Sequence, residues 1–117
     1  MKPHGFPRSR RLADRRVIRS VYEKGRYHRL GVLHAKTLAS GAAETRVLIS
    51  VKKAIGSAPE RNRIKRLVRE ALRLHPPQLP EPHDVCLFLS ARPKQPMGLA
   101  DVQRELHLLS QRLRGGK

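Results

Sequence analysis

The chain has 117 residues, and its 26 Lys and Arg against 9 Asp and Glu give a formal net charge of +17. This length suits a single domain over residues 1–117, and the charge indicates a polyanionic partner, with nucleic acid as the first candidate and an anionic membrane surface as the second. Arg outnumbers Lys, and because guanidinium groups pair with phosphate through two hydrogen bonds and stack on bases, the bias favours nucleic acid. A genome rich in G and C would also raise the Arg content, but it would not explain the net charge.

Residues 1–11 are polar and contain two prolines and a glycine, so we expect an extended basic arm. Its arginines are either phosphate contacts or part of a frayed terminus. No apolar segment follows them, so a secretory signal is not expected, and no stretch approaches the roughly 20 apolar residues of a membrane span. The possible phosphate contacts in the arm are Arg8, Arg10 and Arg11.

A first helix is predicted over 14–24, with Asp14 as N-cap or first-turn residue and Gly25 as its stop. Its apolar residues recur at helical spacing: Val17, Ile18, Val21 and Tyr22. Ile18 and Tyr22 are core residues by default. They are alternatively the lining of a groove in which unpaired bases stack.

Strands are predicted over 32–38 and 46–51, joined by a hairpin-type loop over 38–45. A further buried strand over 85–89 contains Cys86, the single cysteine of the chain. One cysteine can build neither a disulfide framework nor a zinc site, so we expect a buried core thiol and a cytoplasmic protein.

The segment 61–73 predicts a strongly amphipathic helix between Pro59 and Pro76-Pro77. Its apolar face holds Ile64, Leu67, Val68, Ala71 and Leu72, and its polar face holds Asn62, Lys65, Arg66, Arg69 and Arg73. A solvated face normally mixes charge signs, whereas Glu70 is the single acid here. Phosphate binding is therefore favoured over plain solvation.

A proline-rich surface loop over 75–83 follows, and a final amphipathic helix carries Val102, Leu106, Leu109 and Leu113. The expected order is helix, two or more strands, helix, strand, helix, which indicates an α/β arrangement of a small sheet with helices packed on it. The acids and histidines are scattered, with no metal-ligand spacing, nucleophile elbow or phosphate-cradling glycine loop. The residues thus favour a binding protein over a nuclease that acts through its own side chains.

The run Arg-Asn-Arg-Ile-Lys-Arg-Leu-Val-Arg-Glu at 61–70 closely resembles the signature of the bacterial ribonuclease P protein component. The likeness extends over nearly the whole chain. The segment 12–25 resembles the family's first helix and closing glycine, 50–56 the strand end and loop before the signature, and 84–93 the last strand and its exit.

The resemblance implies an α+β two-layer sandwich in α-β-β-β-α-β-α order, of the type seen in the second domain of ribosomal protein S5, with a left-handed β-α-β crossover that holds the signature helix. It implies a complex with a large catalytic RNA that removes the 5′ leader of precursor tRNA, without an obligate protein partner or a membrane. Mg²⁺ ions bound mainly by the RNA would do the chemistry, so no catalytic or metal-binding residue is expected in the protein.

Two sets of site residues follow from the resemblance. The catalytic RNA would be bound by Arg61, Asn62, Arg63, Lys65, Arg66, Arg69 and Arg73. The single-stranded leader would be bound in a cleft between the first helix and the sheet by Ile18, Tyr22 and Lys36, with Lys53 and Arg92 nearby. Ile18 and Lys36 stand where the family often has aromatic residues, which shifts leader affinity towards phosphate contacts. The alternative function is a structural RNA-binding protein of the ribosomal type.

Overall fold

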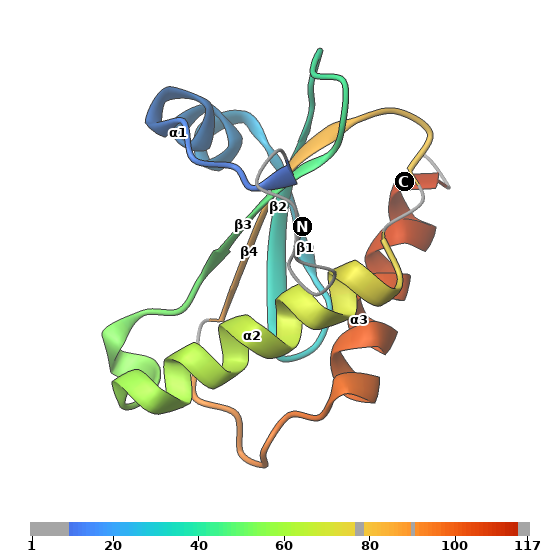
Figure 1. The fold of residues 1–117 in the computed structure, drawn as a ribbon. Helices are drawn as coiled ribbons and strands as arrows, with labels where there is room; N and C mark the ends of the chain where they lie inside the picture. Colours follow the sequence, from blue (N-terminus) through green and yellow to red (C-terminus); the bar gives the residue numbers. More distant parts are fainter. Residues whose placement is uncertain (1–9, 77–78, 90, 115–117) are drawn as a thin grey trace, which may run out of the picture.

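The structure is a computed structural model that describes residues 10–76, 79–89 and 91–114, and it has the α-β-β-β-α-β-α order that the resemblance implied, with one added 3₁₀ turn (Figure 1). The elements are α1 (Arg15–Lys24), β1 (Arg26–Arg29), β2 (Leu33–Ala39), β3 (Arg46–Ser50), η2 (Lys53–Ile55), α2 (Ala58–Leu74), β4 (His83–Leu89) and α3 (Leu99–Arg114). The helix predicted over 61–73 therefore begins three residues earlier. None of the helices in the described residues is long and apolar enough to cross a membrane.

The four strands form one sheet in the order β1-β2-β4-β3. β2 pairs antiparallel with β1 and β4, whereas β3 and β4 are parallel and are connected through α2. The handedness of that connection stays a prediction. The loop expected as a hairpin over 38–45 does not join neighbouring strands, because β4 lies between β2 and β3. The buried run of β4 takes the central place, where both of its faces are covered.

Helices lie on both faces of this sheet. Alternate residues along each strand point to opposite faces, so Ala35 and Leu87 pack with α2 and α3, whereas Leu38 and Cys86 pack with α1. Figure 1 shows α2 and α3 side by side across one face and α1 beyond the other. The mixed α+β class is confirmed. The two-layer description fits the sheet with α2 and α3, and α1 adds a partial third layer.

The helix ends follow from local capping. Asp14 is the N-cap of α1, as predicted, and its carboxylate accepts from the Arg16 N–H at 2.9 Å. Gly25 ends α1, and a Cβ at Gly25 would lie 2.2 Å from the Val21 carbonyl oxygen, so only glycine fits there. Ser57 and Glu60 form a capping box that starts α2 before the signature.

The residue pattern alone did not predict β1. Its sequence is Arg-Tyr-His-Arg, which lacks an apolar run. This strand forms because its backbone pairs with β2, with Tyr27 opposite Lys36 and Arg29 opposite His34. Strand formation at this sheet edge depends on the neighbouring strand more than on local propensity.

Candidate nucleic-acid interface

One face of α2 carries a continuous basic stripe. The spacing of four, three and four residues places Asn62, Arg66, Arg69 and Arg73 along one side of the helix, with Lys65 at its flank. The opposite side buries Ile64, Val68, Ala71 and Leu72 against the sheet and α3. The amphipathic pattern predicted from the sequence is therefore confirmed, and the core holds the basic side outward.

Three arginines of the signature helix are engaged within the protein. The Arg61 guanidinium donates to the Gly56 carbonyl at 3.2 Å, and Arg63 donates to the Met97 carbonyl at 3.1 Å. Arg73 pairs with Glu70 one turn away, which raises the pKa of its guanidinium. These contacts fix the directions of the three side chains and leave them less free to reorganise around a ligand.

The remaining polar groups of the stripe are open to a partner. Within the described part of the chain, the side chains of Lys65, Arg66 and Arg69 make no hydrogen bond or ion pair, and neither does that of Asn62. Asn62 and Arg66 are exposed, and Lys65 and Arg69 are half-buried. Three cations and one amide on a rigid helix offer phosphate contacts in fixed register, with one group for base or ribose hydrogen bonds.

A second surface is a row of rings on the sheet face that α1 only partly covers. The aromatic row, as we call it, runs from Tyr22 on α1 through Phe88 on β4 and His34 on β2 to Tyr27 on β1. Successive ring centroids lie 6.1, 5.4 and 5.7 Å apart. Tyr22 and Tyr27 are 36% and 51% exposed, so the row offers π-faces to a ligand.

Ile18 and Lys36 have different places around this row. Ile18 packs with Val21 and Cys86 in the apolar cluster under α1, which is the default core position considered for it. Lys36 donates from Nζ to the Tyr22 carbonyl at 2.7 Å. That bond places a cation at the last turn of α1, where unpaired carbonyls favour positive charge. Lys36 therefore joins β2 to α1 directly beneath Tyr22.

The thiol below Tyr22 is a core group, as the sequence predicted. Cys86 is fully buried, and burial raises the pKa of its thiol to about 11, with interaction with the Tyr22 hydroxyl partly offsetting this. Burial is also the main cause that raises the pKa of Tyr22. Both groups are neutral at pH 7, and a neutral buried thiol is chemically inert.

Lys53 and Arg92 lie towards the start of α2. Lys53 is exposed in η2. Arg92, in the loop after β4, pairs with Glu60 of α2 at 2.7 Å. The Ser57 backbone N–H and hydroxyl hold the pKa of Glu60 below its usual value, and Arg92 adds to this. The structure therefore places Arg92 beside the beginning of the signature helix.

Of the arm arginines, Arg8 lies outside the described residues. Arg10 pairs with Glu44 at 3.4 Å, and Arg11 is exposed. The backbone around Arg11 runs beside β3, where the Leu12 N–H donates to the Val47 carbonyl at 2.9 Å. Arg11 is thus presented outward from an anchored segment.

Sequence reasoning missed three members of the aromatic row: Tyr27, His34 and Phe88. The alternation of His34 with Lys36 along β2 was a usable signal, because residues two apart share a sheet face. The pairing of His34 with Phe88 across β2 and β4 was not visible, since it depends on strand order.

An α+β scaffold that presents a basic helix face and a separate, partly exposed row of rings has the features of an RNA-binding domain. The family model described as Ribonuclease P matches residues 6–114. The chain therefore belongs to the ribonuclease P protein family.

Named relatives agree with this assignment. The ribonuclease P protein component of Dictyoglomus turgidum is 32% identical over 104 residues, which cover 89% of this chain and 86% of the relative. That of Herpetosiphon aurantiacus is 40% identical over 84 residues, which cover 72% and 68%. The solved ribonuclease P protein of Thermotoga maritima superposes with a TM-score of 0.73 at 25% identity, covering 90% of this chain and 96% of that one.

The fold likeness extends to a second organism. A ribonuclease P protein structure from Staphylococcus aureus has a TM-score of 0.73 at 24% identity and covers 87% of this chain and 93% of that chain. Among the described residues, no group of three or more His, Cys, Asp or Glu side chains could hold a metal ion.

Proposed function

We propose that this chain acts as the protein subunit of a ribonuclease P ribonucleoprotein, in which a catalytic RNA removes the 5′ leader of precursor tRNA. Membership of the family supports the role of an accessory subunit in an endoribonuclease. The protein contributes binding: it holds the RNA subunit through one surface and the leader through another. Its site of action is the cytoplasm, and it needs no protein partner.

The basic stripe of α2 is the surface that binds the RNA subunit. Its open cations, Lys65, Arg66 and Arg69, stand on a helix whose other side is buried, so they contact phosphates without loss of backbone order. Each phosphate neutralised releases condensed counterions, which makes the affinity strongly dependent on salt. The engaged residues Arg61, Arg63 and Arg73 lie at the flanks and end of the same stripe and complete the contact.

The aromatic row is the surface that binds the single-stranded leader. Stacking of a base on an aromatic ring contributes about 1–3 kcal/mol and tolerates any sequence. Phe88, His34 and Tyr27 compensate for the missing ring at Ile18, so leader stacking shifts from the helix to the sheet. Lys36 supplies positive charge at Tyr22, and Lys53 and Arg92 supply it towards the start of α2.

We assign catalysis to the RNA subunit, where bound Mg²⁺ would supply metal-ion chemistry for hydrolysis. The protein's part is to add affinity for the substrate, which lets the complex work when Mg²⁺ is scarce. The positive side chains of α2 also neutralise RNA phosphates, so the RNA folds and binds substrate at a lower concentration of free Mg²⁺.

Reconstitution tests this function. Purified protein added to ribonuclease P RNA should restore cleavage of precursor tRNA at low, near-physiological Mg²⁺, measured as release of the 5′ leader. Protein alone should cleave nothing. Binding to the RNA without stimulation would favour a structural RNA-binding protein of the ribosomal type, and cleavage by protein alone would contradict the proposal.

A further inference from the structure

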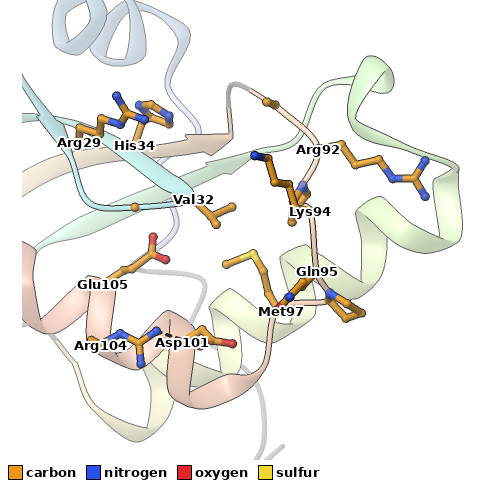
Figure 2. Close-up of a pocket in the computed structure, with 14 residues that line it drawn as sticks. Arg29, Val32, His34, Arg92, Lys94, Gln95, Met97, Asp101, Arg104 and Glu105 are labelled. Atoms are coloured by element: carbon orange, nitrogen blue, oxygen red, sulfur yellow. Dashed lines mark hydrogen bonds and ion pairs between the residues drawn. The ribbon is translucent and has the colours of Figure 1, made fainter.

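A cavity of about 560 Å³ lies at one end of the sheet, next to the aromatic row. It lies where β2 begins and β4 ends, since Leu33 pairs with Leu89 there. Its walls are the turn between β1 and β2, the loop over 91–97 and the first turns of α3 (Figure 2). Two parts of the chain that are distant in sequence, the β1–β2 turn and the segment from the loop over 91–97 into α3, thus enclose one hollow.

The cavity continues from the aromatic row. His34 is a member of the row and also lines the cavity, and Arg29 is the partner of His34 across the β1–β2 ladder. A single strand that runs along the exposed rings of the row therefore passes the buried His34, whose side chain also lines the cavity. This continuity identifies the occupant as single-stranded RNA, because the row already selects unpaired bases.

Glu105 of α3 is the polar group that distinguishes this cavity. Its side chain is buried, with the residue 8% exposed, and Oε1 accepts from the Leu33 N–H at 2.7 Å. Oε2 makes no hydrogen bond to any described residue. Among the described residues, every fully buried polar side-chain atom has a hydrogen-bond partner. Since Oε2 has none, this atom is in contact with solvent. Glu105 lines the cavity.

The turn beside Glu105 is shaped around the carboxylate. Gly31 has a φ of 155°, and a Cβ there would lie 2.8 Å from the Glu105 carboxyl carbon. A residue with a side chain would therefore push Glu105 aside. The acceptor is held in place by the Leu33 bond on one side and by the glycine turn on the other.

The rest of the lining suits a nucleotide. Val32 and buried Met97 supply apolar wall, while Arg29 and Lys94 supply positive charge, with Lys94 directed over the hollow in Figure 2. Arg92, although part of the lining, points away towards α2, where it pairs with Glu60. Apolar wall, two cations and one open carboxylate oxygen match a base, its phosphate and an amino group on that base.

We propose that this cavity binds one unpaired leader nucleotide whose base carries an amino group, which donates to Oε2 of Glu105. An ionised carboxylate only accepts hydrogen bonds. Cytosine, adenine and guanine each carry an exocyclic amino group that donates to such an acceptor. Uracil offers only an imide N–H between two carbonyl oxygens, which the carboxylate repels. The assignment rests on the proposed leader-binding function and adds base selectivity to it.

The test is a set of dissociation constants for precursor tRNA with leaders of cytidine only or uridine only, bound to the reconstituted holoenzyme. The wild type should prefer the cytidine leader by about tenfold, the effect of one hydrogen bond to a charged group. Glu105→Gln should lower the ratio to about one or reverse it, because the amide oxygen still accepts from Leu33 N–H while the amide nitrogen donates to a uracil carbonyl. Glu81→Gln, the same charge change in an exposed loop, should keep the wild-type ratio.

A second measurement needs no variant. Leaders of adenosine and of purine riboside differ only in the amino group, and the wild-type holoenzyme should bind the adenosine leader several-fold more tightly. Equal affinities for these two leaders would overturn the assignment of the cavity, and so would a cytidine-to-uridine ratio that Glu105→Gln leaves unchanged. The proposed leader-binding function would survive either result if precursor tRNA still bound more tightly than mature tRNA. If the leader adds no affinity at all, the leader-binding function fails and the assignment fails with it.

Discussion

Tyr22 connects the first helix to the aromatic row. Its ring lies 6.1 Å from that of Phe88, its carbonyl accepts from Lys36, and it is 36% exposed. Val21, its neighbour in sequence, is fully buried in the cluster beneath α1. One residue of α1 therefore anchors the helix, while the next belongs to the aromatic row.

We expect Tyr22→Ala to reduce the preference of the holoenzyme for precursor over mature tRNA by roughly 5- to 150-fold, the range of one lost base–aromatic stack of about 1–3 kcal/mol. The measurement is the ratio of the two dissociation constants. Tyr22→Phe keeps the ring and should keep the ratio. An unchanged ratio in Tyr22→Ala would show that the leader does not stack there.

Cys86 gives a pH dependence of stability. Its folded-state pKa of about 11 lies above the ordinary value of 9.0, so burial favours the neutral thiol. The associated stability is fully present below about pH 9 and is lost as the pH rises towards 11. A shift of this size corresponds to about 2–3 kcal/mol in the free energy of unfolding.

Urea unfolding at pH 8 and at pH 10.5 measures this effect. The wild type should lose more of its unfolding free energy between the two pH values than Cys86→Ala, which lacks the titrating thiol. Comparison of the two proteins cancels the other groups that titrate in this range. Equal losses in both would show that the thiol already ionises freely in the folded protein.

At the scale of the element, α2 combines a capped start, a buried side and a basic side. The Ser57–Glu60 capping box and Pro59 define its beginning, and Gly56 precedes it. Glu60 has a second role, because Arg92 pairs with it and ties the loop after β4 to the same end. The helix is therefore held at the end from which the signature residues begin.

Arg69→Ala should weaken binding to the RNA subunit and reduce the slope of log affinity against log salt by about 0.9, the value for one lost phosphate contact in duplex nucleic acid. Arg104→Ala is the matched control, because it removes the same charge from an arginine paired with Asp101 on α3. Titrations of labelled RNA at several salt concentrations give both slopes. Equal slopes for the two variants would mean that Arg69 acts only through net charge.

At the scale of the molecule, the sheet separates the two surfaces that we propose for RNA. The basic stripe belongs to α2, which packs on one face, and the aromatic row lies on the face shared with α1. The parallel β3–α2–β4 unit places the helix on one side while β4 carries Phe88 to the other. Under the proposed function, this separation leaves room for the RNA subunit and the leader to be bound at the same time.

Because the two surfaces lie on opposite faces of the sheet, we expect substitutions on them to act independently. In the double variant Arg69→Ala with Tyr22→Ala, the losses in precursor-tRNA binding free energy should add to within about 0.5 kcal/mol, as expected for distant sites. Of the two single variants, only Arg69→Ala should weaken binding of the protein to the RNA subunit. Only Tyr22→Ala should reduce the preference for precursor over mature tRNA. If both single variants lost the same property, or the losses failed to add, the division into two surfaces would be wrong.

The amphipathic helices, their caps and the buried strand at Cys86 were predictable from sequence, because each depends on contacts within a few residues. The basic stripe was predictable for the same reason: helical periodicity alone places Asn62, Arg66 and Arg69 on one side. The arrangement of the sheet was not, since insertion of β4 between β2 and β3 is a choice among long-range pairings.

That choice also decided the second site. His34 and Phe88 are 54 positions apart in the chain, and they stack only because β2 and β4 pair in this register. The cavity with Glu105 likewise needs α3 to return to the start of β2. Sequence by itself determined the charge, the signature helix and hence the family's RNA-binding character. Tertiary structure alone decided which rings lie together in the aromatic row and which carboxylate lines the cavity. These contacts depend on strand order and on helix packing across the sheet.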